Sequence, residues 1–364
     1  MTRAPFLPSC IAWLLAVSAP AQSRPSDPES RPLAPDFTSS NDAADRFLAK
    51  SGLPGAALQI GTREAPVHTR YLGAYSEKTV VPIASASKWL SGALLMTLVD
   101  DGKVDLDAAV GKYLPEFSGD KERITVRMLM NHTSGLPAND DRVHDFRITM
   151  REAARRASEL ELVSDPGTRF AYGGVAMQVA GALCEVAGGA SWNDLFQKRI
   201  ATPCKLQHTR FGVLARAKNP MVAGGAVSSL DEYGRFLRMI VNEGELDGVR
   251  VLSAESVREL LTDRTGKADP RTSLLTRAVG ARGYGVGCWV DEKHDQGQTT
   301  RASSPGAFGF LPWVDLERGA WAVWMIEDRS RRSGLQVAAL NLRKAIQHDL
   351  ATLPLLGADS RRAR

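Results

Sequence analysis

The alternation of apolar and polar positions predicts β-strands near both ends of the chain and a long helical region between them. Helical spacing runs from Asp42 to Ser51, and Gly55 to Gly61 and Val67 to Tyr75 follow as two strands. Strand character returns in three late segments rich in aromatic and β-branched residues: Tyr284 to Val290, Gly309 to Asp315 and Ala320 to Glu327. Strands this far apart imply one sheet that both ends of the chain complete.

The region between these strands, about 90–275, has a mostly helical pattern interrupted by glycine-containing and proline-containing turns. Its first helix is strongly apolar and runs from Ser85 to Gly102, and an amphipathic helix from Gly334 to Ala351 closes the chain. The order predicts an α+β fold, residues 42–355, with a large helical lobe inserted into it. A site is then expected between the two lobes.

The two ends of the chain are expected to lie outside this domain. Residues 1–21 have the features of a signal peptide, with Arg3, an apolar run from Cys10 to Val17 and a small-residue cleavage site at Ala21. Export to the periplasm or the medium is therefore expected. The apolar run is shorter than the roughly 20 residues that span a bilayer, which argues against a stable membrane span. Residues 22–41 are predicted to be a disordered lead-in, and 356–364 a frayed basic tail.

The amino-acid composition argues against several classes of function. The net charge is +5, but 46 basic residues are interspersed with 41 acidic ones, which argues against a nucleic-acid partner. Cys184, Cys204 and Cys288 remain after the signal peptide and lack C-x-x-C spacing, so neither a disulfide framework nor a zinc site is indicated. Three buried thiols are expected, although one pair could form a bridge in an oxidising compartment. No cofactor or metal is expected.

Ser85 and Lys88 form an S-x-x-K motif whose spacing suits a nucleophile and its activating base. Residues three apart share a helix face, and a partly desolvated lysine favours its neutral form, which can take a serine proton. The motif is short enough to arise by chance, and a second copy begins at Ser118 in a polar stretch. Ser85 instead follows an apolar lead and opens an apolar helix. At this point Ser85 is either a nucleophile or a plain helix cap.

Longer segments around this motif resemble the β-lactamase-related serine hydrolases, which include class C β-lactamases, D-alanyl-D-alanine carboxypeptidases and similar esterases. The resemblance covers roughly residues 50–330. The segments occur in family order: IASASK, DDGKVDLDAAVGKYLPEF, ITVRMLMNHTSGLP, PGTRFAYGG, KLQHTRF, AGGAVSSLDEYGRFLRMI and YGVGCWV. The resemblance implies a β-lactamase/transpeptidase-like fold, with an antiparallel sheet flanked by helices.

The resemblance also implies roles for individual residues. Ser85 corresponds to the acylated nucleophile, Lys88 to its partner, and Tyr172 to the tyrosine of the family's Y-x-N element, with a pKa that a nearby ammonium would lower. Ser304-Pro305-Gly306 corresponds to the K-T-G or H-x-G element, where Gly306 would leave room for substrate. The backbone N–H groups of Ser85 and Ala307 would form the oxyanion hole. A core position for the tyrosine and a simple turn at 304–306 remain alternatives.

Two departures from the family pattern bear on the substrate. Gly174 stands where the asparagine of Y-x-N is expected, and Ser304 stands where a lysine or histidine would bind a carboxylate. Both positions are predicted to line the substrate site. Each lost charge-assisted hydrogen bond is worth roughly 1.5 to 3 kcal/mol, so an uncharged ester is favoured over an anionic amide. Arg301 could replace the missing cation, and His132 is expected to have a capping or packing role.

The sequence is compatible with three alternative functions. The first is an exported serine hydrolase that forms an acyl-enzyme on Ser85 and acts on small esters or amides, including ones derived from peptidoglycan. The second is a D-alanyl-D-alanine carboxypeptidase or weak β-lactamase. The third is a non-catalytic relative that binds peptidoglycan or a protein partner. The sequence leaves the oligomeric state open.

Overall fold

The computed structural model describes residues 1, 36–212, 217–272, 280–330 and 333–352. The predicted signal peptide beyond Met1, most of the predicted lead-in and the predicted basic tail lie outside these residues. Helix α1 spans Thr38–Ser51 and so begins before Asp42, where the sequence pattern placed its start. The reason is local: the carboxylate of Asp36 accepts a hydrogen bond from the Thr38 N–H at 2.9 Å and satisfies a donor of the first turn.

The largest sheet has seven antiparallel strands in the order β2-β1-β12-β11-β10-β9-β8. Strand β1 pairs with β12, so that Leu58 lies opposite Trp324, and the sheet is completed by distant parts of the chain as predicted. The strands are β1 (Gly55–Gly61), β2 (Pro66–Gly73), β8 (Gly283–Tyr284), β9 (Trp289–Lys293), β10 (Thr299–Ser303), β11 (Leu311–Asp315) and β12 (Ala320–Met325).

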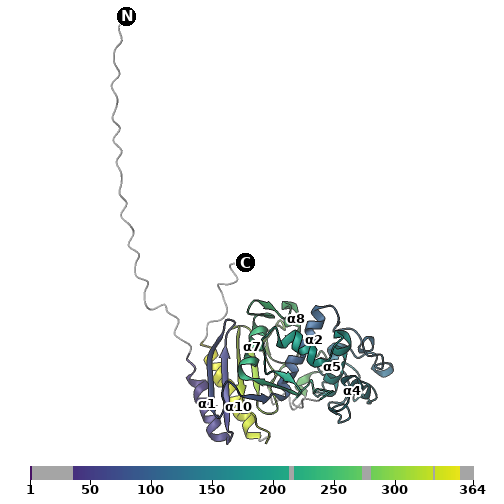
Figure 1. Cartoon of the computed structure of the whole chain (residues 1–364), viewed down its shortest axis with the longest axis horizontal. Coiled ribbons are helices and arrows are strands. Elements are labelled where there is room, and N and C mark those ends of the chain that lie inside the picture. The colour runs from purple at the N-terminus through teal and green to yellow at the C-terminus, as the bar shows by residue number, and fades with distance from the viewer. Residues whose placement is uncertain (2–35, 213–216, 273–279, 331–332, 353–364) are drawn as a thin grey trace. The chain divides into compact units, whose positions relative to one another are not determined.

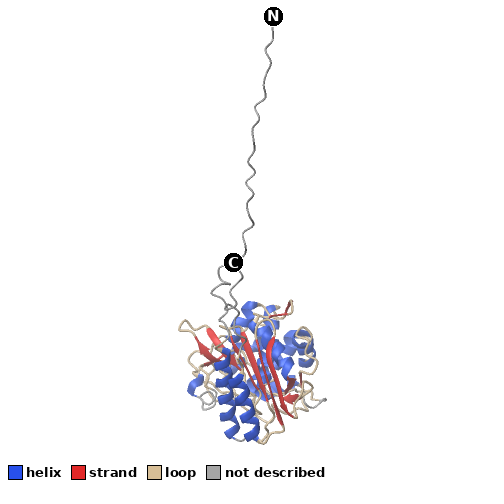
Figure 2. Ribbon diagram, turned by 90° about the vertical axis from the view of Figure 1, so that its left-hand side faces the viewer, coloured by secondary structure: helices blue, strands red, loops and turns tan. Residues whose placement is uncertain are grey.

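Helices cover both faces of this sheet. Helices α1 and α10 (Ser333–Leu350) lie together on one face, as Figures 1 and 2 show, and the Ser40 N–H donates to Asp349 Oδ2 at 2.7 Å between them. Phe47 and Ile346 of these helices pack in one buried cluster with Trp324 of the sheet. Helix α7 (Leu230–Val241) packs against β1, β11 and β12. The fold is therefore a β-lactamase/transpeptidase-like α+β fold with an antiparallel sheet.

The middle of the chain is mostly helical, as predicted. Its helices are α2 (Ser87–Asp100), α3 (Val126–Met130), α4 (Met150–Ser158), α5 (Val175–Gly188), α6 (Trp192–Phe196) and α8 (Ala254–Leu261). Five short strands also occur here: β3 (Val80–Pro82), β4 (Arg210–Phe211) and β5 (Ala226–Ser229) form one sheet, and β6 (Glu245–Leu246) pairs with β7 (Val249–Arg250).

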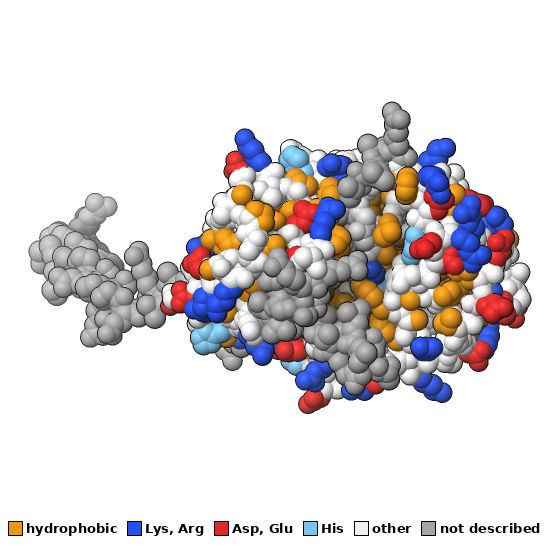
Figure 3. Space-filling model, turned by 90° about the horizontal axis from the view of Figure 1, so that it is seen from below, with side chains coloured by type: hydrophobic (Ala, Val, Ile, Leu, Met, Phe, Trp, Pro, Cys, Tyr) orange, Lys and Arg blue, Asp and Glu red, His pale blue; other side chains and the backbone are white. Residues whose placement is uncertain are grey.

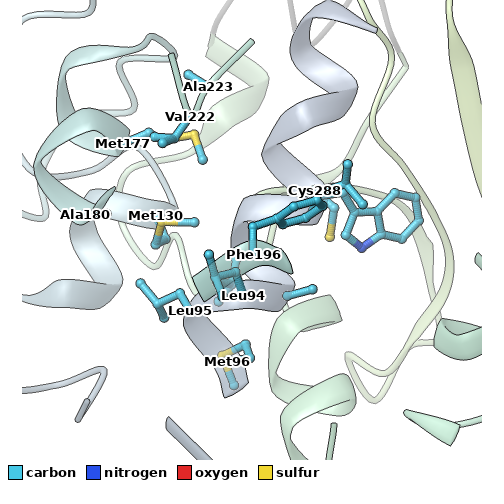
Figure 4. Packing of buried hydrophobic residues seen from close by; sticks show 14 of the residues in the cluster. Leu94, Leu95, Met96, Met130, Met177, Ala180, Phe196, Val222, Ala223 and Cys288 are labelled. Atoms are coloured by element: carbon cyan, nitrogen blue, oxygen red, sulfur yellow. The ribbon is translucent and has the colours of Figure 1, made fainter. Parts of the chain in front are cut away.

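Helix α2 is the central element of this region, because nearly all of its side chains are buried. A helix that is apolar on every side must be surrounded by protein. Leu94, Leu95 and Met96 of α2 lie in one packed cluster with Met130 of α3 and Met177 of α5 (Figure 4). This packing fixes the position of the first turn of α2, which carries Lys88.

The prediction of one strand from Tyr284 to Val290 was wrong. Strands β8 and β9 are separated by a tight turn in which the Gly285 N–H donates to the Cys288 carbonyl at 2.9 Å and Gly287 has a φ of +86°. Glycine adopts this conformation without steric cost, so the turn is built from the glycines of the segment. Strand β10 was missed because its sequence, TTRAS, has no apolar alternation.

The cysteines are placed as predicted, and charges of both signs lie on the surface. Cys184, Cys204 and Cys288 are free and buried, which confirms the prediction of three buried thiols. On the face shown in Figure 3, positive and negative side chains are interspersed. Among the described residues, no helix is both long and apolar enough to cross a bilayer.

We expect Gly92→Ala to destabilise the protein, because a Cβ on Gly92 would lie 2.0 Å from the Val286 carbonyl oxygen of the β8–β9 turn. Helix propensity alone would make this substitution stabilising by about 0.5 to 1 kcal/mol, whereas overpacking against backbone costs about 1 to 3 kcal/mol. Urea denaturation measures the free energy of unfolding. Gly188→Ala in α5 is the control, because its added Cβ meets only the side chain of Leu195, which can move. An increase in stability for Gly92→Ala would contradict this packing.

Candidate active site

Ser85 lies in a single 3₁₀ turn, Ala84–Ala86, that leads directly into α2. The residue before it, Ala84, has a φ of +46°, a left-handed conformation that a non-glycine residue adopts at some cost. The Ser87 hydroxyl donates to the Ala84 carbonyl at 2.6 Å and accepts from the Ala226 N–H at 3.0 Å, which holds this backbone in place. Such strain is stored where the surroundings fix an unfavourable geometry. Ser85 is only half-buried.

Lys88 lies directly beside this serine. Its Nζ donates to Ser85 Oγ at 3.2 Å and to the Ala223 carbonyl at 2.6 Å, and the residue is buried. Burial is the cause that lowers the pKa of Lys88 from 10.5 to about 7. Among the described residues, no carboxylate pairs with it. A substantial fraction of Lys88 is therefore neutral near pH 7 and can accept a proton.

Tyr172 also lies close to Lys88, with its ring centroid 4.6 Å from Lys88 Nζ. Its hydroxyl interacts with that of Ser85, so the structure brings all three residues together. The expectation of a lowered pKa was wrong: burial raises the pKa of Tyr172 to about 12 and outweighs the opposing effect of Ser85. The ring stacks on Trp289 with centroids 5.1 Å apart, so Tyr172 is also part of a packed aromatic cluster.

The segment Ser304–Ala307 lies against the nucleophile turn. The Ser304 hydroxyl donates to the Ser85 carbonyl at 3.2 Å. A Cβ on Gly306 would lie 2.2 Å from the Ile83 carbonyl oxygen, so glycine is required here for close approach of two backbone segments. The Gly306 N–H donates to Phe310, whereas the Ala307 N–H donates to no group among the described residues. A free N–H at this position is what an oxyanion hole would need.

His132 packs against Tyr172. It is buried among Phe170, Tyr172 and Tyr284, and its Nε2 lies 3.3 Å from the Tyr284 hydroxyl. Burial, and secondarily the charge of Lys88, hold the pKa of His132 well below its usual value, so the ring is neutral. This arrangement agrees with the expected packing role.

The space beside Gly174 is filled by a side chain that the sequence did not predict to be part of the site. A Cβ on Gly174 would lie 2.5 Å from Nε2 of His144, so the imidazole fills the place of the missing side chain. His144 lies in a loop with no recognisable motif. The absence of asparagine at position 174 was the one feature of the sequence that could have indicated another side chain at this place.

Two further side chains lie outside this site. Arg301, considered as a replacement cation, pairs with Glu292 at 2.8 Å and with Asp315 at 3.0 Å. Ser118, in the second S-x-x-K match, is exposed, and Lys121 there pairs with Asp120 at 3.0 Å. Among the described residues, no group of three or more His, Cys, Asp or Glu side chains is placed to hold a metal ion.

The chain as a whole is similar to known proteins. The sequence profile described as Beta-lactamase matches residues 41–345. The chain belongs to the Beta-lactamase family. Members with this fold are serine hydrolases, so the turn that carries Ser85 and Lys88 lies within a family whose chemistry uses a serine nucleophile.

Individual relatives extend the similarity over most of the chain. A solved structure of the β-lactamase type from Bacteroides dorei DSM 17855 is 29% identical, covers 87% of this chain and 99% of its own, and has a TM-score of 0.78. Penicillin-binding protein 4 of Amycolatopsis lactamdurans is 27% identical over 73% of this chain and 79% of its own. EstCE1, a hydrolase with promiscuous acyltransferase activity, shares the fold at 17% identity, with a TM-score of 0.70 and coverage of 85% and 97%.

Proposed function

We propose that this protein is an exported serine hydrolase that forms an acyl-enzyme on Ser85 and hydrolyses small, uncharged esters. The observation that carries the proposal is the contact between Ser85 Oγ and Lys88 Nζ at 3.2 Å, with the lysine buried and without a carboxylate partner among the described residues. A base with a pKa near the working pH combines a large neutral fraction with useful basicity.

In the proposed reaction, neutral Lys88 takes the proton of Ser85 as Oγ attacks the ester carbonyl. The N–H groups of Ser85 and Ala307 stabilise the oxyanion that forms. Tyr172 is protonated near pH 7 because its pKa is raised, and it supplies the proton for the departing alcohol. Lys88 returns its proton to Tyr172. Water then attacks the acyl group with Lys88 as base, and the acid is released as Ser85 is restored.

The preference for an uncharged ester rests on the charges around Ser85. A substantial fraction of Lys88 is neutral in this site, Ser304 offers a hydroxyl in place of a cation, and Arg301 is paired with two carboxylates. A substrate carboxylate would therefore lose its hydration without gaining an ionic partner from Ser304 or Arg301. Carboxypeptidase or β-lactamase activity is therefore the alternative to ester hydrolysis. The similarity to penicillin-binding protein 4 supports this alternative.

We expect the mature protein to hydrolyse p-nitrophenyl butyrate and to accumulate an acyl adduct on Ser85, and Ser85→Ala to lose both. The serine oxygen is the atom to which the acyl group bonds, so its removal should lower kcat/KM by at least about a thousandfold. Absorbance at 405 nm follows turnover, and intact mass spectrometry during turnover detects the adduct. Ser118→Ala is the matched control and should be unchanged. Full activity in Ser85→Ala would contradict the assignment of the nucleophile.

We also expect benzylpenicillin to acylate Ser85 far more slowly than the ester does, because neither Ser304 nor the paired Arg301 offers the penicillin carboxylate a free cation. The measurement is the rate of adduct formation by intact mass at equal concentrations of the two reagents. Ser304→Lys should accelerate acylation by penicillin relative to the ester. Rapid labelling of the unmodified protein would instead support the carboxypeptidase or β-lactamase alternative.

A further inference from the structure

A backbone carbonyl, that of Ala223, gives the amino group of Lys88 a fixed direction. A lysine has a flexible four-carbon stem that allows many orientations of its amino group. Lys88 Nζ donates to the Ala223 carbonyl at 2.6 Å and lies 3.2 Å from Ser85 Oγ. When the neutral amine directs one N–H to this carbonyl, its lone pair can face the serine hydroxyl. The geometry of the base therefore depends on where the Ala223 carbonyl lies.

The Ala223 carbonyl belongs to a turn that lies outside the helices and strands. The N–H groups of Gly224 and Gly225 close this turn by donating to the Met221 carbonyl, at 3.1 and 2.6 Å. These two bonds shape the turn, but they do not attach it to the rest of the fold. Its place relative to Ser85 therefore depends on contacts with neighbouring elements.

Two buried side chains make such contacts at Val222, the residue before Ala223. The Ser91 hydroxyl donates to the Val222 carbonyl at 2.7 Å, and the Val222 N–H donates to Gln178 Oε1 at 3.3 Å. Ser91 and Gln178 are each 1% exposed. Water has little access at this depth, so the loss of either side chain would leave a backbone group without its partner.

Ser91 and Gln178 belong to the two helices that carry, or directly follow, the catalytic side chains. Ser91 lies on α2, one turn after Lys88. Gln178 lies on α5, which begins at Val175, three residues after Tyr172. Consecutive peptide groups of the turn thus contact α5, α2 and Lys88 itself. The turn is attached to the helix that carries the base and to the helix that follows the tyrosine.

Gln178 is itself fixed by the other half of its amide. Its Nε2 donates to the Asn219 side chain and, at 2.8 Å, to the Pro220 carbonyl. Asn219 in turn donates to the Val143 and Asp145 carbonyls, at 2.9 and 3.0 Å. A side chain whose orientation is locked by hydrogen bonds in this way can hold another group with the accuracy that catalysis needs.

We propose that Ser91 and Gln178 are positioning residues for the base of the reaction. They hold the two peptide groups of Val222, and through them the Ala223 carbonyl that directs Lys88 Nζ toward Ser85 Oγ. This role rests on the proposed acyl-enzyme chemistry at Ser85. It makes the rate of acylation depend on two buried side chains that act through the backbone.

The test uses two substitutions of Ser91 that have the same shape. Ser91→Thr keeps the hydroxyl and Ser91→Val does not, so the effect of added bulk is common to both. With enzyme in excess over p-nitrophenyl butyrate, the release of p-nitrophenol in a single turnover gives the maximal rate of acylation and the half-saturating enzyme concentration. Ser91→Val should acylate at least about tenfold more slowly than Ser91→Thr at a similar half-saturating concentration, because a misplacement of about 1 Å can cost about a hundredfold in rate.

Thr97→Val is the matched control on the same helix. The Thr97 hydroxyl is buried and donates to the Leu94 carbonyl of α2 at 2.7 Å. Its removal therefore costs a buried hydrogen bond in α2 without changing a contact of the turn. Thr97→Val should acylate at the rate of the unmodified protein, even if its melting temperature falls.

A second pair of variants tests the same role if Ser91→Val fails to fold. Gln178→Met has a side chain of similar length that offers the Val222 N–H no oxygen, so acylation should slow. Gln178→Glu keeps an oxygen at this place and should lose less of the rate. Melting temperatures of all variants identify those that fold.

The outcomes distinguish this role from the proposed function. If the unmodified protein releases no p-nitrophenol and intact mass shows no acyl group on Ser85, the proposed function fails and the positioning role fails with it. If Ser85 is acylated but Ser91→Val reacts as fast as Ser91→Thr, or changes only the half-saturating concentration, the positioning role is overturned. An equal loss of rate in Thr97→Val would also overturn it, because the loss would then reflect stability alone. A slower maximal rate in Ser91→Val than in Ser91→Thr, or in Gln178→Met than in Gln178→Glu, supports it.

Discussion

The burial of an amino group beside Ser85, with no partner of opposite charge in the part of the chain that the structure describes, is the constraint on which the site depends. Taking an ammonium out of water is costly, and the cost is avoided when the group loses its proton. Lys88 is placed in this position by α2, whose side chains are buried on nearly every side, and by the carbonyl of Ala223. The helix packing that stabilises the fold therefore also produces the base that the proposed chemistry requires.

The same desolvation acts on the other ionisable groups around the nucleophile. It lowers the pKa of Lys88, His132 and His144 and raises that of Tyr172, so every one of these groups is shifted toward its neutral form. A site of this kind offers hydrogen bonds and proton transfer but little net charge. This is the physical reason for proposing an uncharged ester as the substrate in place of an anionic amide.

The sequence predicted the parts of the site that depend on local spacing. Lys88 follows Ser85 by three positions, and one 3₁₀ turn followed by a helix brings residues at this spacing together. The meeting of early and late strands was likewise predictable from their apolar patterns. The proximity of Tyr172 and of Ser304–Ala307 to Ser85 was expected from family resemblance, because positions so distant along the chain share no local periodicity.

What the sequence did not predict depends on tertiary packing. The segment from Tyr284 to Val290 has the composition of a strand, but its glycines form a turn that approaches α2 closely at Gly92. The pKa of Tyr172 was expected to fall because of a nearby ammonium, whereas burial of the side chain has the larger effect and raises it. His144 could not be found because it reaches Gly174 through contacts of Asn219 and not through any spacing in the chain.

The most direct test of this account is the titration of Lys88 itself. Lysine labelled with ¹³C at Cε gives one NMR signal for each residue, and the signal absent from the Lys88→Met spectrum identifies Lys88. Its chemical shift is followed from pH 5 to pH 11 in the folded protein. Because burial lowers the pKa of Lys88, the account predicts that this signal changes with a midpoint near pH 7, well below the signals of exposed lysines. A midpoint near pH 10.5 would show that Lys88 stays charged in the site and would contradict its role as the base that activates Ser85.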